Sequence, residues 1–346
     1  MAKIFSAFRD GWGRVLRAPA ILAGVFLLTL VAVIPFGLVL EQDISASLGH
    51  SLDAQTMAAG VNSEWWDRFG ESATGLGRTF TSTIIGFAAV LDNLSGFLDG
   101  NRPFPLALAG LGAAYLAVWV FLIGGILDRY ARMRPLRTPA FFAACGVYFF
   151  RFIRLGIIAG LGYALLLWHV HGWLFRDLYG WATKDLTVER TGFAINVALY
   201  AVFLALVSFW NLVMDYAKVR AVVEDRHSML GAFLAGWRFV VGHPLKTGGL
   251  YLLNAAMFLI VVGLYGLAAP GAAGFGRTAW LVFAVGQIYL LARLAVKLSF
   301  YASAVSLFQR SLAHVGYTAA PEVLWPDSPA AEGIINASPK DGTPAS

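Results

Sequence analysis

Four charged residues could do chemistry inside the apolar stretches of this chain. Arg293 and Lys297 lie four positions apart within one such stretch, which places both side chains on one face of a helix. Charge at membrane depth is costly, so such residues pair, face the interior of a helix bundle or reach the membrane surface. We expect Lys297 to reach the surface and Arg293 to face the bundle. Asp215 and Asp128 end two other apolar stretches and are the expected partners of Arg293.

Two roles stay open for Arg293 at this point. One is a structural salt bridge with a carboxylate, and the other is a site for an anionic headgroup or substrate. Together, Arg293, Lys297, Asp215 and Asp128 form the candidate intramembrane polar site.

Motifs for catalysis or metal binding are missing from the sequence. It contains no Gly-x-Ser-x-Gly, His-Glu-x-x-His, phosphate-binding loop or dinucleotide-binding fingerprint. His169 and His171 are two positions apart, so on a helix they point in nearly opposite directions and do not chelate one ion. Cys145 is the single cysteine, which excludes an intrachain disulfide and a multi-cysteine metal site. We therefore predict no enzyme activity, no metal and no cofactor.

Composition indicates a polytopic membrane protein. Of the 346 residues, 58% are hydrophobic and only 13% are charged, and the mean hydropathy is +0.68. Soluble domains have about a quarter charged residues. The net charge of +6 is explained by Lys and Arg on cytoplasmic loops, and no basic module for nucleic acid is present.

Apolar stretches predict six membrane-spanning helices in a membrane domain of residues 1–312. The spans are residues 21–40, 104–127, 155–175, 193–214, 250–268 and 280–298. The first is too long for a cleaved signal peptide. Residues 41–103 form a polar outer loop with amphipathic helices, in which a re-entrant segment at 80–91 is the less favoured alternative. Residues 313–346 are predicted to be a disordered cytoplasmic tail.

Basic residues gather before the odd spans and after the even ones. This distribution places the N- and C-termini on the cytoplasmic side, in a bacterial inner membrane. Gly156 and Gly160, four apart in the third span, predict close helix packing.

A sequence pattern recurs where the chain enters and leaves the spans. A Gly-Trp pair followed by a proline precedes the first and fifth spans, and a tyrosine marks the end of each even span; the residues are Gly11, Trp12, Pro19, Gly236, Trp237, Pro244, Tyr130, Tyr216 and Tyr301. The middle copy keeps only Gly146, without the Trp or the Pro. We predict three tandem hairpins, each preceded by an amphipathic interfacial helix. The alternative is that these residue types recur because each favours the membrane interface.

The Asp-Tyr-Ala-Lys-x-Arg sequence at residues 215–220, followed by Phe-x-x-Gly-Trp and a proline at 233–244, carries a family resemblance. It resembles poorly characterised bacterial multi-span proteins and is similar to the membrane domain that some glycerophosphodiester phosphodiesterases carry beside their catalytic barrel. The resemblance covers residues 120–310, roughly. The chain has neither that barrel nor its His-Arg-Gly motif, so the resemblance implies no phosphodiesterase residues here.

These observations predict an all-α integral membrane protein without catalytic activity. We expect it to organise lipid, with anionic lipid at its cytoplasmic face, or a membrane-protein partner. The alternative is a small-solute or anion transporter or channel, with Arg293, Asp215 and Asp128 lining a path.

Overall fold

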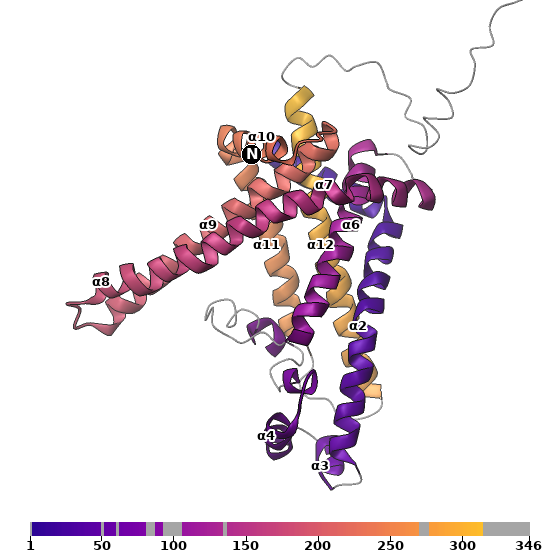
Figure 1. Cartoon of the computed structure of the whole chain (residues 1–346), viewed down its shortest axis with the longest axis vertical. Helices are drawn as coiled ribbons and strands as arrows, with labels where there is room; N and C mark the ends of the chain where they lie inside the picture. The colour runs from indigo at the N-terminus through magenta and orange to yellow at the C-terminus, as the bar shows by residue number, and fades with distance from the viewer. Residues whose placement is uncertain are drawn as a thin grey trace, which may run out of the picture. The chain divides into compact units, whose positions relative to one another are not determined.

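Helices make up the parts of the chain that the computed structural model describes, which are residues 2–49, 52–59, 62–80, 87–92, 106–133, 137–269 and 277–313. Among these residues there is no strand (Figure 1), which confirms the all-α prediction. The elements are α1 (Ala2–Leu16), α2 (Pro19–Leu48), α3 (Asp53–Ala59), α4 (Ser63–Ser72), the 3-10 turn η1 (Gly77–Thr79), α6 (Leu106–Arg132), α7 (Thr138–Ala164), the π-helical segments η3 (Leu165–Val170) and η4 (Trp173–Leu178), α8 (Tyr179–Thr183), α9 (Glu189–Val223), α10 (Met229–Gly242), α11 (Pro244–Ala268) and α12 (Arg277–Ala313).

Six helices are long and apolar enough to cross a membrane, as predicted. They are Pro19–Leu48, Ala109–Arg132, Thr138–Thr183, Glu189–Val223, Pro244–Ala268 and Trp280–Leu312. Several extend beyond their apolar stretches, because a helix that has started continues through polar residues at little cost; α2, for example, reaches Leu48 in the predicted outer loop. Residues 81–86 and the tail from 314 lie outside the described residues. The chain is thus a multi-pass membrane protein by length and composition of its helices.

The chain divides into two compact units. The first unit contains Met1–Arg17, Trp119–Leu253 and the chain from Ser299 onward, and the second contains Ala18–Val118 and Asn254–Leu298. The first unit therefore holds α1, α7, α9, α10 and the last parts of α6 and α12.

Prolines start two of the long helices. Pro19 opens α2 and Pro244 opens α11, positions where the missing N–H and fixed φ of proline fit the first turn. The preceding residues leave the helical conformation, with φ −130° and ψ 56° at Ala18 and φ −136° and ψ 49° at His243. The middle copy of the pattern has no proline, and there α7 runs without a break from Thr138.

Glycines allow close helix contacts within the first unit, and three of them illustrate this. A Cβ atom on Gly236 of α10 would lie 2.7 Å from the backbone nitrogen of Ala217 in α9. One on Gly11 of α1 would lie 2.7 Å from the backbone of Ser303 in α12. One on Gly125 of α6 would lie 2.5 Å from the sulfur of Cys145 in α7. At these points only a residue without Cβ lets the helices approach so closely.

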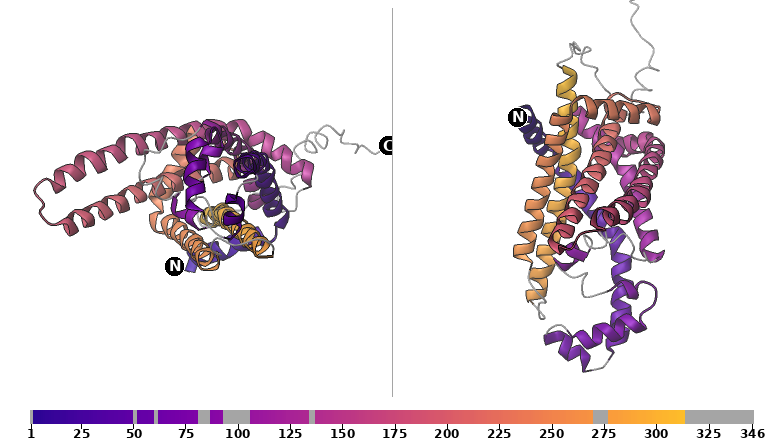
Figure 2. Two further views of the ribbon diagram at one scale, coloured as in Figure 1. Left: turned by 90° about the horizontal axis from the view of Figure 1, so that it is seen from below. Right: turned by 90° about the vertical axis from the view of Figure 1, so that its left-hand side faces the viewer.

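Two long helical arms lie side by side in the first unit, one from α7 to α8 and the other formed by α9 (Figure 2). A Cβ on Gly162 would overlap the Trp210 ring at 2.0 Å, and the Trp210 indole N–H donates to the carbonyl oxygen of Ala159 at 3.2 Å. Gly156 and Gly160 meet nothing within 4 Å, so the predicted packing at those two glycines is wrong. The close contact between the two arms lies at Gly162, because this glycine faces the Trp210 indole.

Aromatic packing orders the polar stretch of the second unit. Trp65 and Phe69 of α4 are buried and stack at 4.9 Å between ring centroids, and Trp66 lies 4.5 Å from Phe80. Asn62 caps α4 by accepting a hydrogen bond from the Trp65 backbone N–H.

We expect Gly236→Ala to destabilise the protein, because the added methyl would force α10 away from α9. Overpacking of this kind costs about 1 to 3 kcal/mol. Thermal unfolding of the purified protein in detergent measures the effect. Gly242→Ala on the same helix is the matched control, since a Cβ there meets nothing within 4 Å, and it should be neutral or slightly stabilising. Equal losses for both variants would contradict the assigned contact.

Candidate functional site

Polar side chains form a stripe along one face of α9. They recur every three or four positions, the spacing of one helix face, and are Ser208, Asn211, Asp215 and Lys218. Two other helices supply partners to the middle of the stripe. The Tyr163 hydroxyl donates to Asn211 Oδ1 at 3.3 Å, and Asn211 Nδ2 donates to the Tyr251 hydroxyl at 3.0 Å. Buried polar groups in an apolar helix require such partners.

An ion pair ends this stripe. Lys218 Nζ lies 2.6 Å from Asp215 Oδ1, and the side chains keep 21% and 12% of their surface exposed. The ammonium also lies 5.2 Å from the centroid of the Tyr301 ring in α12, within the range of a cation–π contact. The Trp119 ring of α6 lies beyond Tyr301, with the ring centroids 6.5 Å apart. Side chains of α9, α12 and α6 thus come together around this pair.

The predicted intramembrane residues have separate surroundings. Asp128 pairs with Arg132 one turn further along α6, at 2.8 Å. Arg293 is exposed, and Lys297 lies 6.0 Å from the centroid of the Tyr115 ring. Both cations belong to the second unit, whereas Asp128 and Asp215 belong to the first. The cation beside Asp215 is Lys218, three positions further along α9.

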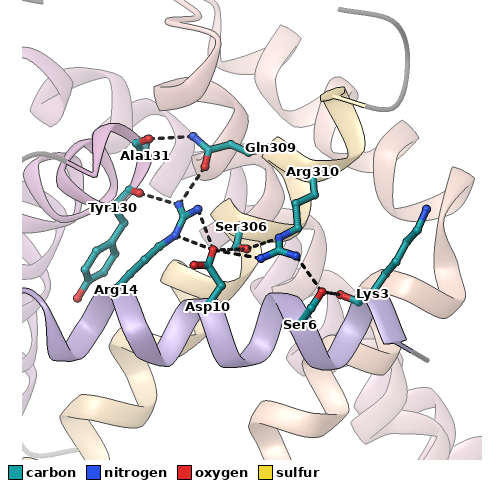
Figure 3. A network of polar contacts seen from close by, with 9 residues as sticks. All are labelled: Lys3, Ser6, Asp10, Arg14, Tyr130, Ala131, Ser306, Gln309 and Arg310. Carbon is teal, nitrogen blue, oxygen red and sulfur yellow. Dashed lines mark hydrogen bonds and ion pairs between the residues drawn. The ribbon is translucent and has the colours of Figure 1, made fainter. Parts of the chain in front are cut away.

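A second polar network joins α1 to the ends of α6 and α12 (Figure 3). Arg14 Nη1 donates to the backbone carbonyl of Tyr130 at 2.7 Å, and Gln309 Nε2 donates to that of Ala131 at 2.9 Å. The last four carbonyls of a helix have no partner within it. Arg14 and Gln309 therefore cap α6 from outside, and Arg14 Nη1 also donates to Gln309 Oε1 at 2.9 Å.

Asp10 is the acidic centre of this network. Its Oδ2 accepts from Ser306 at 2.7 Å and from Arg14 at 3.1 Å, and it lies 3.7 Å from Arg310 (Figure 3). Burial raises the pKa of Asp10, but the Ser306 hydrogen bond and the charges of Arg14 and Arg310 outweigh it, so the pKa is lowered. Burial lowers the pKa of Arg14, which is only 9% exposed.

Two guanidinium groups enclose one carboxylate at the end of α9. Arg220 and Arg226 both bind Glu224, with Arg220 Nη2 at 2.7 Å from Glu224 Oε1. Burial raises the pKa of Glu224, and the hydrogen bonds from the two arginines more than offset this, so the pKa is lowered. Arg220 also donates to the carbonyl of Ala235 at 2.8 Å, which fixes α10 on α9.

The tyrosines of the recurring pattern are all buried. Tyr130, Tyr216 and Tyr301 are exposed by 1%, 1% and 7%. Within the described residues, the hydroxyls of Tyr130 and Tyr216 have no hydrogen-bond partner. Trp12 is half-buried, and Trp237 is 40% exposed.

Metal coordination has no geometric support in the part of the chain that is described, where no three His, Cys, Asp or Glu side chains come together.

Sequence reasoning missed the α1 network. Its members are Asp10, Arg14, Ser306, Gln309 and Arg310. A signal exists, because Asp10 and Arg14 are four apart and the residues on α12 are three and four apart, so each set forms one helix face. The contact between these two faces can be seen only in the folded structure, because the two helices are far apart in the sequence.

We expect Asp10→Asn to destabilise the protein by about 1 to 3 kcal/mol at neutral pH, because Arg14 loses its carboxylate. The folded pKa of Asp10 is below its ordinary 3.8, so its contribution is complete above that value and is lost as pH falls through the folded pKa. The wild type should therefore approach the variant below about pH 4. Thermal unfolding across pH measures the difference.

Asp185→Asn is the control for this experiment, since Asp185 is exposed in the α8–α9 loop. A gap between wild type and Asp10→Asn that does not change with pH would contradict the role given to Asp10.

Comparison with known proteins assigns no family to this chain. No protein-family model, no curated protein and no solved structure matches this chain. The functional argument therefore depends on the geometry alone.

Proposed function

We propose that this chain is a non-catalytic, multi-pass protein of a bacterial inner membrane that organises anionic lipid through helices at its cytoplasmic face. The arrangement proposed is three tandem hairpins, each preceded by an interfacial helix. A partner membrane protein could occupy the same face, and lipid is favoured because the surface described next combines apolar and basic side chains.

The observation that carries the proposal is the free face of α10. One side of α10 is buried, through residues such as Ala232, Gly236 and Val240. The other side exposes an apolar stripe at helical spacing, formed by Leu230, Leu234, Trp237 and Val241. Arg238 lies beside this stripe and Lys246 follows it at the start of α11, and both are exposed. An exposed apolar stripe with basic residues beside it suits a helix that lies in the membrane interface.

The two other entry segments have related surfaces. α7 exposes Phe142, Phe150 and Ile157 together with Arg154. α1 exposes Phe5 and Leu16, and its exposed cations are Lys3, Arg9 and Arg17. Juxtamembrane clusters of Lys and Arg attract anionic headgroups, at about 1 kcal/mol for each cation.

Separate observations support the proposed repeat and the proposed topology. Ala18 and His243 have nearly the same backbone angles before Pro19 and Pro244, and Gly11 and Gly236 both abut a helix backbone. Capping by Arg14 places α1 at the ends of α6 and α12. α1 and the C-terminal ends of α6 and α12 therefore lie on the same side, which agrees with the prediction that both termini are cytoplasmic.

Transport of a small anion is the second candidate function. It is favoured by the polar stripe of α9, which ends at the Asp215–Lys218 pair. Buried ionisable residues in spans mark substrate paths in transporters.

We expect the double variant Arg238→Gln/Lys246→Gln to retain less anionic lipid, because two cations beside the apolar stripe are removed. At about 1 kcal/mol for each cation, the preference for phosphatidylglycerol over phosphatidylcholine should fall about tenfold or more at low salt. Mass spectrometry of lipid bound to protein purified with an equal mixture of the two lipids measures the ratio.

Lys184→Gln/Arg190→Gln is the matched control, because it removes two exposed cations from the opposite end of α9. It should keep the wild-type ratio. A wild type without any preference for phosphatidylglycerol, or an equal loss in both double variants, would refute the proposal.

A further inference from the structure

The chain after α12 contains a short apolar segment between two acidic residues. Residues 321–327 read Pro-Glu-Val-Leu-Trp-Pro-Asp, so that three adjacent apolar side chains are flanked by Glu322 and Asp327. Residues 314–346 contain four acids and one lysine, whereas the chain as a whole carries a net charge of +6. Residues 321–327 are called the acidic tail segment. Its composition is complementary to an apolar surface with basic residues beside it.

The free face of α10 is a surface of that kind. The four apolar side chains of its stripe keep between 40% and 65% of their surface exposed. Arg238 and Lys246 are exposed, and neither forms an ion pair within the part of the chain that the structure describes. Apolar surface and unneutralised cations therefore lie side by side on one helix face, where a ligand with apolar side chains and carboxylates would satisfy both.

The end of α12 lies next to α10, which brings the start of the tail close to this face. The Phe308 ring of α12 and the Phe239 ring of α10 are 5.1 Å apart between centroids. The Arg220 guanidinium of α9 lies 5.3 Å from the centroid of the same Phe308 ring. α12 ends at Ala313, about 8 Å further along its axis at 1.5 Å per residue. The tail thus leaves the folded helices beside α10.

The connecting residues are long enough to reach the free face. Residues 314–322 span up to about 30 Å when extended. The path around α10, from the side that contacts Phe308 to the opposite side, is half the circumference of a helix 10–12 Å across, or about 16 to 19 Å. A tether of this length holds its ligand at an effective concentration on the order of millimolar. Weak contacts are therefore sufficient to favour this segment over a separate partner.

We propose that the free face of α10 is the docking site of the acidic tail segment, and that anionic lipid displaces the segment from it. Glu322 and Asp327 pair with Arg238 and Lys246, and the apolar residues 323–325 cover the stripe. Zwitterionic lipid leaves these ion pairs in place, whereas an anionic headgroup competes for the same two cations. The competition rests on the lipid binding proposed for this surface, but the docking does not.

Disulfide cross-linking of the whole chain tests the docking. The cysteines are introduced by Leu234→Cys on the stripe and Leu324→Cys in the tail, and the native Cys145 is fully buried. Oxidation in phosphatidylcholine nanodiscs should join positions 234 and 324 within one chain, as shown by mass spectrometry of the digested protein and a monomer on a non-reducing gel. Lys184→Cys/Leu324→Cys is the matched control and should not cross-link, because Lys184 is exposed at the far end of α9.

Charge reversal in the cross-linking variant tests the assigned ion pairs. Glu322→Lys/Asp327→Lys should slow the cross-linking about fivefold or more at low salt, because two exposed ion pairs are lost. Adding Arg238→Glu/Lys246→Glu to this variant should restore the rate, because the pairs then form with the opposite polarity. Restoration also shows that the slower variant is folded.

Lipid composition tests the competition. Cross-linking should be slower in phosphatidylglycerol nanodiscs than in phosphatidylcholine nanodiscs, by up to about tenfold, the preference expected from two cations at low salt. Leu324→Ser/Trp325→Ser, which removes the apolar part of the segment, should retain more phosphatidylglycerol than the wild type when purified with an equal mixture of the two lipids.

The outcomes separate docking from lipid binding. Absence of the cross-link, a cross-link between two chains, or a charge reversal without effect would overturn the docking. Equal cross-linking in both lipids would overturn the competition. If the proposed lipid function alone fails, Leu324→Ser/Trp325→Ser will show no preference for phosphatidylglycerol while the cross-link within the chain still forms.

Discussion

Most of the enclosed cations in the described part of the first unit are neutralised by a carboxylate one turn away in the sequence. Four such pairs are described there, Asp10–Arg14, Asp128–Arg132, Asp215–Lys218 and Arg220–Glu224, whereas Arg151 of α7 pairs with the distant Asp225. An unpaired charge in an apolar interior is far more costly than a paired one. Because the counterion of each such cation is close in the sequence, the helix face that carries the pair packs against its neighbours without an uncompensated charge.

The cost of an unpaired buried charge also determines which cations lie at the surface. Cations without a carboxylate at helical spacing, such as Arg238 and Lys246, are exposed. They lie beside the exposed apolar side chains of α10, on the surface to which we assign anionic lipid.

Hydropathy was sufficient to predict six helices, because the length of each apolar stretch exceeds what a soluble helix needs. The prolines of the recurring pattern precede the first and fifth predicted spans, and in the structure α2 and α11 begin at them, at Pro19 and Pro244. For Asp215 the sequence analysis named Arg293 as the partner, whereas the structure pairs Asp215 with Lys218 on the same helix. The α1 network was not predictable, because Arg14 and Gln309 are 295 residues apart. A charged pair at helical spacing is the same in sequence whether its helix is exposed or buried.

That separation has a consequence for assembly. The contacts of α1 are completed by α12, since Asp10 and Arg14 find Ser306 and Gln309 only after α12 has been made. Contacts so distant in sequence form late, because the loop that they close carries a large entropic cost. Until then the end of α6 lacks the caps that Arg14 and Gln309 supply to the carbonyls of Tyr130 and Ala131. The Asp10–Arg14 pair balances the charge on the face of α1 that docks, so docking does not first have to desolvate an unpaired Arg14.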